Sequence, residues 1–490
     1  MTSLAIRATR GAFATLGGQW GRFVVQLASL AILARLLTPG DYGIVSMVMA
    51  VAGLAYVVGD FGLSMAAVQA KSLSKGQSSN LFWLNTAIGL VLAFVVYAIS
   101  SPLATFYGRQ EIEDVAKALS VVFLISGLGA QFRAEATRQM KFVGMAYVDV
   151  VSQLGALIVA VVVALLGGGY WALVAQQITQ SAITLLALAL VSKWCPSWPN
   201  RRGRITGMLR FGANTSAVQI INYASSNFDS LLVGKTFGAE ALGIYDRAFQ
   251  LFRMPLQQVA APITRVALPV LSGIDDNQLY NRYIVRAQLI LSYSLGGVFF
   301  IAIALSGPIL TLMLGDGWGA AVGIFQILAV GGIFQALGYV YYWVFLSRAL
   351  TGLQLAYSVF TKSVMIALMI IGSFFGPAGV ACGVSGGLFF HWLVLTIFAV
   401  PRAGVMVLPI IAVTVRPFLV YTTMLVPSLY VGTLIENLAP ILQFLVLFSV
   451  CCAYIAAMLI WPSVRKDVAL ILRTLKNAAP SLRSVRKSQK

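Results

Sequence analysis

Long apolar runs follow one another from end to end of this chain, each interrupted by a few polar or turn-forming residues. Each run is about 20 residues long, the length at which an α-helix crosses the hydrocarbon core of a bilayer. The apolar positions are continuous rather than alternating, which favours helices over half-buried strands. Turn-forming clusters such as Thr38-Pro39-Gly40 and Gly376-Pro377 separate the runs. The pattern predicts an all-α polytopic membrane protein with about 14 transmembrane helices.

The predicted spans are located by their centres, which lie near Val25, Ala52, Gly89, Leu124, Val161, Ile183, Ser225, Val259, Phe300, Ile333, Ile366, Phe390, Val420 and Phe448. Composition agrees with this interpretation, because the 490 residues are 59% hydrophobic and only 10% charged. A soluble domain carries about 25% charged residues. The first run contains Gln19, Arg22 and Gln26 and lacks a small-residue cleavage site, so we interpret it as a transmembrane helix and not as a signal peptide.

Basic residues are concentrated at alternate turns between the runs. The richer set includes both ends of the chain together with Lys71, Lys75, Arg133, Arg138, Lys141, Arg201, Arg202, Arg204, Arg282 and Arg286. By the positive-inside rule this set is cytoplasmic, so both termini are predicted to be cytoplasmic. The net charge of +19 then reflects topology and attraction to membrane lipid, and no nucleic-acid partner is needed to explain it.

A segment near the N-terminus recurs about two hundred residues later. Gln19–Ser46 aligns with Gln219–Asp246, placing Gly43 on Gly243 and Arg35 on Lys235. Both copies are an apolar span that ends in a basic residue and is followed by a Gly-containing turn and a second span. Internal repeats of this kind are typical of transporters whose substrate lies between two halves.

Charged residues inside the predicted spans lie before residue 260, spans nine to fourteen hold almost none, and the amides follow the same asymmetry. The charged ones are Arg22, Asp60, Asp149, Asp229, Asp246, Arg247 and Arg253, and the amides include Gln19, Gln26, Gln219 and Asn222. Ionisable residues within a membrane usually face a cavity or a partner. We therefore predict a polar, mildly cationic cavity among spans one, two, seven and eight.

The chemistry of these side chains leaves several roles open. Guanidinium groups bind phosphate in a bidentate manner, so Arg22 and Arg253 are candidate phosphate contacts; a structural pair is the alternative for Arg22. Asp60, Asp149 and Asp229 are candidates for coupling to a proton or sodium gradient, or for structural pairing. Lys235 ends its span and is expected to extend toward the interface.

Several stretches resemble a known family. They are "LARLLTPGDYGIVSMV" (33–48), "VGDFGLSMAAVQ" (58–69), "SSNLFWLN" (78–85), "RQMKF" (138–142), "GGGYWALVAQQ" (167–177) and "YDRAFQLFRMPLQQVAAPITRVALPVLS" (245–272). They resemble Wzx-type flippases of the exopolysaccharide and colanic-acid type, within the multidrug/oligosaccharidyl-lipid/polysaccharide exporter superfamily. The last stretch is also similar to a helix of peptidoglycan lipid-precursor flippases.

The resemblance implies a fold and a function. It implies two pseudo-symmetric six-helix lobes around a central cavity, over residues 1–200 and 201–403, then two further helices over 404–463 and a basic tail over 464–490. It implies flipping of an undecaprenyl-diphosphate-linked oligosaccharide from the inner to the outer leaflet of the bacterial inner membrane. Asp41 and the Asp246-Arg247 pair would belong to outward-side closure, and Arg22 and Arg253 to the cavity.

Three other interpretations of function remain open, and one of them is a structural scaffold for an export complex, to which the basic tail would contribute. A drug or cation antiporter of the same superfamily is disfavoured by the cationic cavity. A membrane polysaccharide polymerase or ligase usually needs a large outer loop with catalytic residues, whereas the outer turns here are short. No phosphate-binding glycine loop and no metal-ligand spacing occurs, so we expect a non-enzyme without cofactor or metal. A complex with a polysaccharide polymerase or export machinery is a further expectation.

Overall fold

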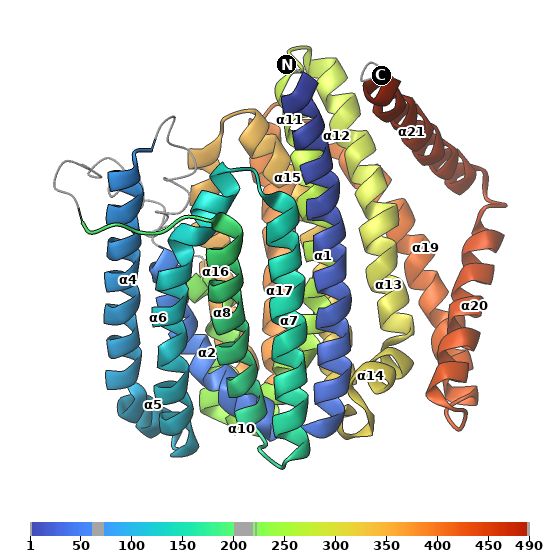
Figure 1. The fold of residues 1–490 in the computed structure, drawn as a ribbon. Coiled ribbons are helices and arrows are strands. Elements are labelled where there is room, and N and C mark those ends of the chain that lie inside the picture. Colours follow the sequence, from blue (N-terminus) through green and yellow to red (C-terminus); the bar gives the residue numbers. More distant parts are fainter. Residues whose placement is uncertain (1, 61–72, 200–218, 221–222, 488–490) are drawn as a thin grey trace. The chain divides into compact units, whose positions relative to one another are not determined.

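A computed structural model describes residues 2–60, 73–199, 219–220 and 223–487 of the chain (Figure 1). Every regular element in these ranges is a helix. The chain divides into two compact units, Met1–Gly243 with Met313–Gly317, and Ile244–Leu312 with Trp318–Lys490. The predicted lobe boundary near residue 200 lies outside the described residues and stays a prediction.

The first unit is built from a row of neighbouring helices. Its elements are α1 (Thr2–Leu36), α2 (Pro39–Asp60), α4 (Lys75–Ala98), α5 (Ser100–Tyr107), α6 (Glu111–Arg138), α7 (Phe142–Leu165), α8 (Trp171–Ser192) and the first part of α10 (Phe228–Pro255). Helix α4 packs on α6, α6 on α8, α8 on α7 and α7 on α1, while α2 packs across α6 (Figure 1).

The second unit begins within α10 and continues to the end of the chain. Its elements are η1 (Leu256–Ala260), α11 (Ala261–Ser272), α12 (Asn277–Leu291), η2 (Ser292–Gly296), α13 (Gly297–Ala304), α14 (Ser306–Leu314), η3 (Asp316–Trp318), α15 (Ala320–Ser347), α16 (Thr351–Ser373), α17 (Gly376–Val394), η4 (Leu395–Ala399), α18 (Val400–Arg402), α19 (Val407–Leu434), α20 (Pro440–Met458) and α21 (Pro462–Lys487). The unit boundary assigns a few residues around η3 to the first unit.

The two units repeat one packing pattern. The sequence α4–α6–α8–α7 in the first unit corresponds to α13–α15–α17–α16 in the second, and α11 crosses α15 as α2 crosses α6. Helices α19 and α20 pack against each other after this duplicated set, and α21 contacts α12. The prediction of two pseudo-symmetric lobes followed by two further helices is confirmed.

Eleven helices in the described residues are long and apolar enough to cross a membrane. They coincide with predicted spans two to six and nine to fourteen. Of the other three predicted spans, the one centred near Val25 corresponds to α1. Val259 lies in η1, between α10 and α11, and the span centred near Ser225 includes residues outside the described ranges. The polytopic membrane class is therefore confirmed, whereas the count of fourteen stays a prediction.

The repeat of the N-terminal segment has a counterpart in the backbone. Helix α10 leaves helical geometry at Gly238, where φ is 84° and ψ is −176°. The matching position in the first copy is Thr38, where the chain passes from α1 to α2. A positive φ of this size favours glycine, so Gly238 allows the second copy to break at the same point as the first.

Matched glycines of the two copies meet within the first unit. A Cβ atom on Gly43 would lie 1.7 Å from the carbonyl oxygen of Ala239. A Cβ atom on Gly243 would lie 1.8 Å from the carbonyl oxygen of Pro39. The two contacts are equivalent under the offset of the repeat, because Pro39 aligns with Ala239. The backbones of α2 and α10 therefore cross at a distance that only glycine allows.

Candidate functional site

A cavity of about 790 Å³ lies within the first unit, lined by residues of α1, α2, α6, α7 and α8. This volume falls in the range of about 300–1,000 Å³ that is usual for small-molecule sites. Most of the wall is apolar, as the composition of these helices requires. The functional interest lies in the charged and polar side chains that this wall carries.

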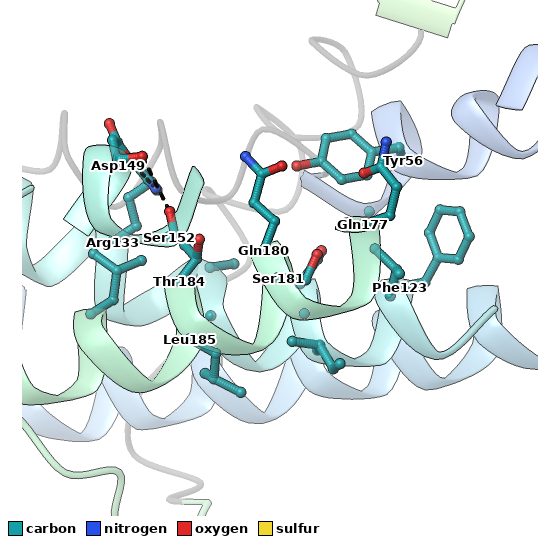
Figure 2. Close-up of a pocket in the computed structure, with 18 of the residues that line it drawn as sticks. Tyr56, Phe123, Arg133, Asp149, Ser152, Gln177, Gln180, Ser181, Thr184 and Leu185 are labelled. Carbon is teal, nitrogen blue, oxygen red and sulfur yellow. Dashed lines mark hydrogen bonds and ion pairs between the residues drawn. The ribbon is translucent and has the colours of Figure 1, made fainter. Parts of the chain in front are cut away.

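Three charged side chains line the cavity: Arg22 of α1, Arg133 of α6 and Asp149 of α7. Arg133 donates to Asp149, with 2.9 Å between Nη2 and Oδ1 (Figure 2). About half of the Arg133 side chain remains exposed, and Asp149 is about a quarter exposed. One of the two cationic charges is thus offset by the carboxylate. The cavity retains a net positive charge from these residues, which suits an anionic ligand.

Arg22 is held by its backbone rather than by an ion pair. In the amide orientation that satisfies both groups, Gln153 of α7 donates to the carbonyl of Arg22 at 3.3 Å and accepts from the N–H of Gln26 at 3.3 Å. This amide therefore inserts between the two groups that close one helical turn of α1. Arg22 is exposed, and none of the side chains that the structure describes forms an ion pair with it. Its guanidinium is available to a ligand.

Polar contacts fix the helices that form the wall. Gln176 of α8 donates to Ser29 of α1 at 2.8 Å. Lys141, at the turn between α6 and α7, donates through Nζ to the carbonyls of Val191 (2.9 Å) and Ser192 (3.1 Å). The Lys141 ammonium donates to carbonyl acceptors that the end of α8 leaves unpaired. Its positive charge is also stabilised by the negative C-terminal end of the helix dipole.

The remaining polar lining comes mainly from one face of α8. Gln177, Gln180, Ser181 and Thr184 line the cavity, and Tyr56 of α2 also lines it. Figure 2 shows the Arg133–Asp149 pair toward the Thr184 end of this face and Tyr56 toward the Gln177 end. The cavity therefore has a charged end and an uncharged polar end.

Two of the predicted cavity or coupling residues, Arg22 and Asp149, line the same cavity. Gln19 and Gln26 lie half-buried on α1 outside its lining, Gln219 is exposed, and Asn222 lies outside the described residues. Arg253 belongs to the second unit, where its guanidinium carbon lies 4.4 Å from the centre of the Phe249 ring. The roles predicted for these residues stay predictions.

The residues predicted to act in gating or coupling have separate surroundings. Asp41 accepts hydrogen bonds from the Thr38 N–H (2.9 Å) and hydroxyl (2.7 Å) at the start of α2. Lys235 donates to the carbonyl of Phe106 and lies 4.6 Å from the centre of its ring. Asp229 is buried in the first unit, whereas Asp246 and Arg247 are half-buried in the second. Asp60 ends α2, and its side chain lies outside the described residues.

The sequence singles out Gln177 and Gln180 as polar residues inside a span, but it does not indicate that they and Arg133 line one cavity. Arg133 was assigned to the cytoplasmic basic set, and nothing local distinguishes it from a topological charge. The α8 face had a readable signal, since Gln177, Gln180, Ser181 and Thr184 recur at helical spacing within an otherwise apolar span. No group of three or more metal-binding side chains occurs among the described residues.

A family profile and individual relatives both relate this chain to proteins of polysaccharide biosynthesis. The sequence profile of a family described as polysaccharide biosynthesis protein matches residues 32–323. The teichuronic acid biosynthesis protein TuaB of Bacillus subtilis is 28% identical over 320 residues, which are 64% of this chain and 66% of TuaB, just under two thirds of its length. The lipopolysaccharide biosynthesis protein WzxC of Escherichia coli is 25% identical over 403 residues, covering 80% of this chain and 79% of WzxC.

Solved structures share the fold at low sequence identity. The lipid II flippase MurJ in an inward closed conformation superposes with a TM-score of 0.72 at 17% identity, covering 92% of this chain and 99% of MurJ. An inward-facing multidrug-resistance transporter of the MATE family, in the MOP superfamily, gives 0.59 at 14% identity, covering 78% of this chain and 94% of that one.

Proposed function

Because this chain belongs to the polysaccharide biosynthesis protein family, we propose that it carries a diphosphate-linked oligosaccharide on a polyprenyl lipid from the inner to the outer leaflet of a bacterial inner membrane. The observation that carries the proposal is the cavity of the first unit. It places an arginine without a described ion-pair partner, a second arginine and a set of amides and hydroxyls inside a lobe that is otherwise apolar.

The physical need for such a cavity follows from the chemistry of the head group. A diphosphate and several sugar hydroxyls cannot enter hydrocarbon, because each unpaired polar group costs several kcal/mol there, on the order of 2–7 per neutral group. A cavity that hydrogen-bonds the head while the prenyl chain stays in lipid removes most of that cost. Exchange of the cavity between the two faces of the membrane then moves the head across.

Arg22 is assigned the phosphate contact. A guanidinium grips a phosphate with two parallel hydrogen bonds, and the exposed side chain of Arg22 has no carboxylate competing for it among the described residues. Arg133 shares its charge with Asp149 and so contributes less. Drug cations are the alternative cargo, and the cationic balance of the lining argues against them.

The direct test is leaflet transfer in liposomes that contain only the purified protein. The probes are undecaprenyl-diphosphate-linked glucose, galactose and N-acetylglucosamine, and an impermeant sugar-modifying enzyme added outside reports arrival in the outer leaflet. We expect transfer of at least one probe without bond formation to it. Arg22→Ala is expected to reduce transfer about 10- to 100-fold, the value of charge-assisted hydrogen bonds, and Arg22→Lys to retain part of it.

Arg109→Ala is the matched control, because Arg109 is an exposed residue whose nearest carboxylate, Glu111, lies 4.0 Å away. It should transfer the probes at the wild-type rate. Normal transfer by Arg22→Ala would remove Arg22 from the mechanism. Lengthening of a sugar chain by the purified protein would instead favour a polymerase, and the absence of any transfer would refute flipping.

The proposal also includes the setting in which the protein works. Both termini are assigned to the cytoplasm from the distribution of basic turns. Coupling to a proton or sodium gradient and association with a polysaccharide polymerase or export complex belong to the proposal as well. Imposing each gradient separately on the liposomes would identify the coupling ion by the change in transfer rate.

A further inference from the structure

The polar face of α8 has a regular spacing. Gln177, Gln180, Ser181 and Thr184 follow one another at steps of three, one and three residues, which places them along one side of the helix. All four line the cavity and are half-buried. We call this set the α8 stripe. Figure 2 shows its members together with Tyr56 in the cavity wall.

The side chains of the α8 stripe form no hydrogen bond within the part of the chain that the structure describes. Hydroxyls outside the α8 stripe behave differently, including that of Thr137, which also lines the cavity. Thr86, Thr105 and Thr137 each donate to the carbonyl four residues earlier on their own helix, at 2.8, 3.0 and 2.8 Å. The hydroxyl of Tyr56 likewise has no protein partner among the described residues. The cavity therefore presents a cluster of donors and acceptors to which residues 2–60, 73–199, 219–220 and 223–487 supply no hydrogen-bond partner.

The neighbouring amide on α8 provides a contrast. Gln176 lies next to Gln177 in the sequence, but its side chain donates to Ser29 and ties α8 to α1. An amide of α8 that holds two helices together therefore has a hydrogen-bond partner within the protein. Half-buried amides and hydroxyls that stay unsatisfied inside a membrane protein are unfavourable unless water or a ligand completes them.

We propose that the α8 stripe and Tyr56 bind the sugar of the lipid-linked glycan and so determine which glycan the protein accepts. This inference rests on the function proposed above. Amides and hydroxyls carry both donors and acceptors without charge, which matches the hydroxyls of a sugar better than a diphosphate. Arg22 and the Arg133–Asp149 pair supply the charge for the diphosphate, and Tyr56 adds an aromatic ring to the uncharged end.

If the cavity is divided in this way, the affinity for a sugar-bearing lipid should depend on the α8 stripe by a predictable factor. A neutral hydrogen bond contributes about 2- to 13-fold in binding. Loss of one or two members of the α8 stripe should therefore weaken binding of a sugar-bearing lipid by about 3- to 30-fold. For the stripe members nearer the uncharged end, Gln177 and Gln180, the affinity for the same lipid diphosphate without a sugar should stay unchanged, because a diphosphate held at the charged end does not reach them (Figure 2).

The experiment compares dissociation constants in nanodiscs for undecaprenyl diphosphate and for its glucose, galactose and N-acetylglucosamine conjugates. The wild-type protein should bind at least one conjugate more tightly than undecaprenyl diphosphate. Gln177→Met and Gln180→Met should bring that preference close to one, each preserving the approximate size of the side chain. Thr179→Val is the matched control, because Thr179 lies on α8 outside the cavity lining, and it should retain the wild-type preference.

The outcomes separate this inference from the function on which it rests. Failure of the wild-type protein to bind any of the four lipids would refute the proposed function. Binding of all four with equal affinity, or an unchanged sugar preference in both stripe variants, would refute the role of the stripe and leave flipping intact. Weakened binding of undecaprenyl diphosphate by the stripe variants would also overturn it, since the stripe would then act on the diphosphate or on the fold.

Discussion

Alanine in place of Gly43 is expected to force apart the crossing of α2 and α10. The added Cβ would lie 1.7 Å from the carbonyl oxygen of Ala239, 2.4 Å from its carbonyl carbon and 2.8 Å from its Cα. All three atoms belong to backbone, so no side chain can rotate to make room. Real Cβ contacts stay above 3.0 Å. The two helices would therefore have to separate locally by more than about 1 Å, a shift that overpacked cores accommodate at a cost of about 1–3 kcal/mol.

The equivalent substitution on the other helix should have the same effect. A Cβ on Gly243 would lie 1.8 Å from the Pro39 carbonyl oxygen, so Gly243→Ala is expected to lower stability by a similar amount. One separation of the helices relieves both clashes. The double variant should therefore cost clearly less than the two single variants added together, by about 0.5–3 kcal/mol of coupling.

The assay is thermal unfolding of the purified protein in detergent, with Gly40→Ala as the matched control on the same helix. The nearest atom to a Cβ on Gly40 is the Thr38 hydroxyl at 3.7 Å, an ordinary contact, so this variant should unfold at or above the wild-type temperature. Equal melting temperatures for Gly43→Ala and Gly40→Ala would refute the close crossing. Fully additive effects in the double variant would refute a shared contact.

Two further predictions concern polar contacts that position helices. Asp467 of α21 accepts hydrogen bonds from Arg416 of α19 at 2.6 Å and from the Tyr293 hydroxyl at 3.1 Å. Asp467→Ala should therefore release α21 and make the C-terminal segment more sensitive to limited proteolysis. Unchanged cleavage would contradict the anchoring of α21 by these contacts. Lys141→Met should lower the melting temperature, because it removes a cation from the last carbonyls of α8 and so reduces the free energy of unfolding by about 1–2 kcal/mol. An unaltered melting curve would show that water replaces the amine.

Local pattern was sufficient for the elements of the fold. The length of each apolar run predicted a membrane-spanning helix, and eleven helices among the described residues meet that expectation. The turn at Thr38-Pro39-Gly40 was readable because proline is favoured in the first turn of a helix, and α2 indeed begins at Pro39. The repeat pointed to the duplicated packing of the two units, since similar segments fold into similar helices.

The candidate site was only partly readable. Arg22 and Asp149 could be selected because charge is costly inside a membrane, whatever surrounds it. Arg133 could not, because its role depends on α6 and α7 bringing it within 2.9 Å of Asp149. The same holds for the α8 stripe: its spacing was visible, but the side of α8 that faces the cavity depends on how α8 packs against α1, α6 and α7.

By itself, the sequence determined that this protein crosses a membrane many times and that the charges inside its predicted spans lie almost entirely before residue 260. Those properties depend on residues that are neighbours in the sequence, so they can be predicted from the sequence pattern. The tertiary structure alone decided which polar groups meet and which remain open to the cavity, and that the matched glycines Gly43 and Gly243 lie at one helix crossing. Such contacts depend on how each helix is rotated and how closely it packs against its neighbours. That packing is determined jointly by residues that lie far apart in the sequence.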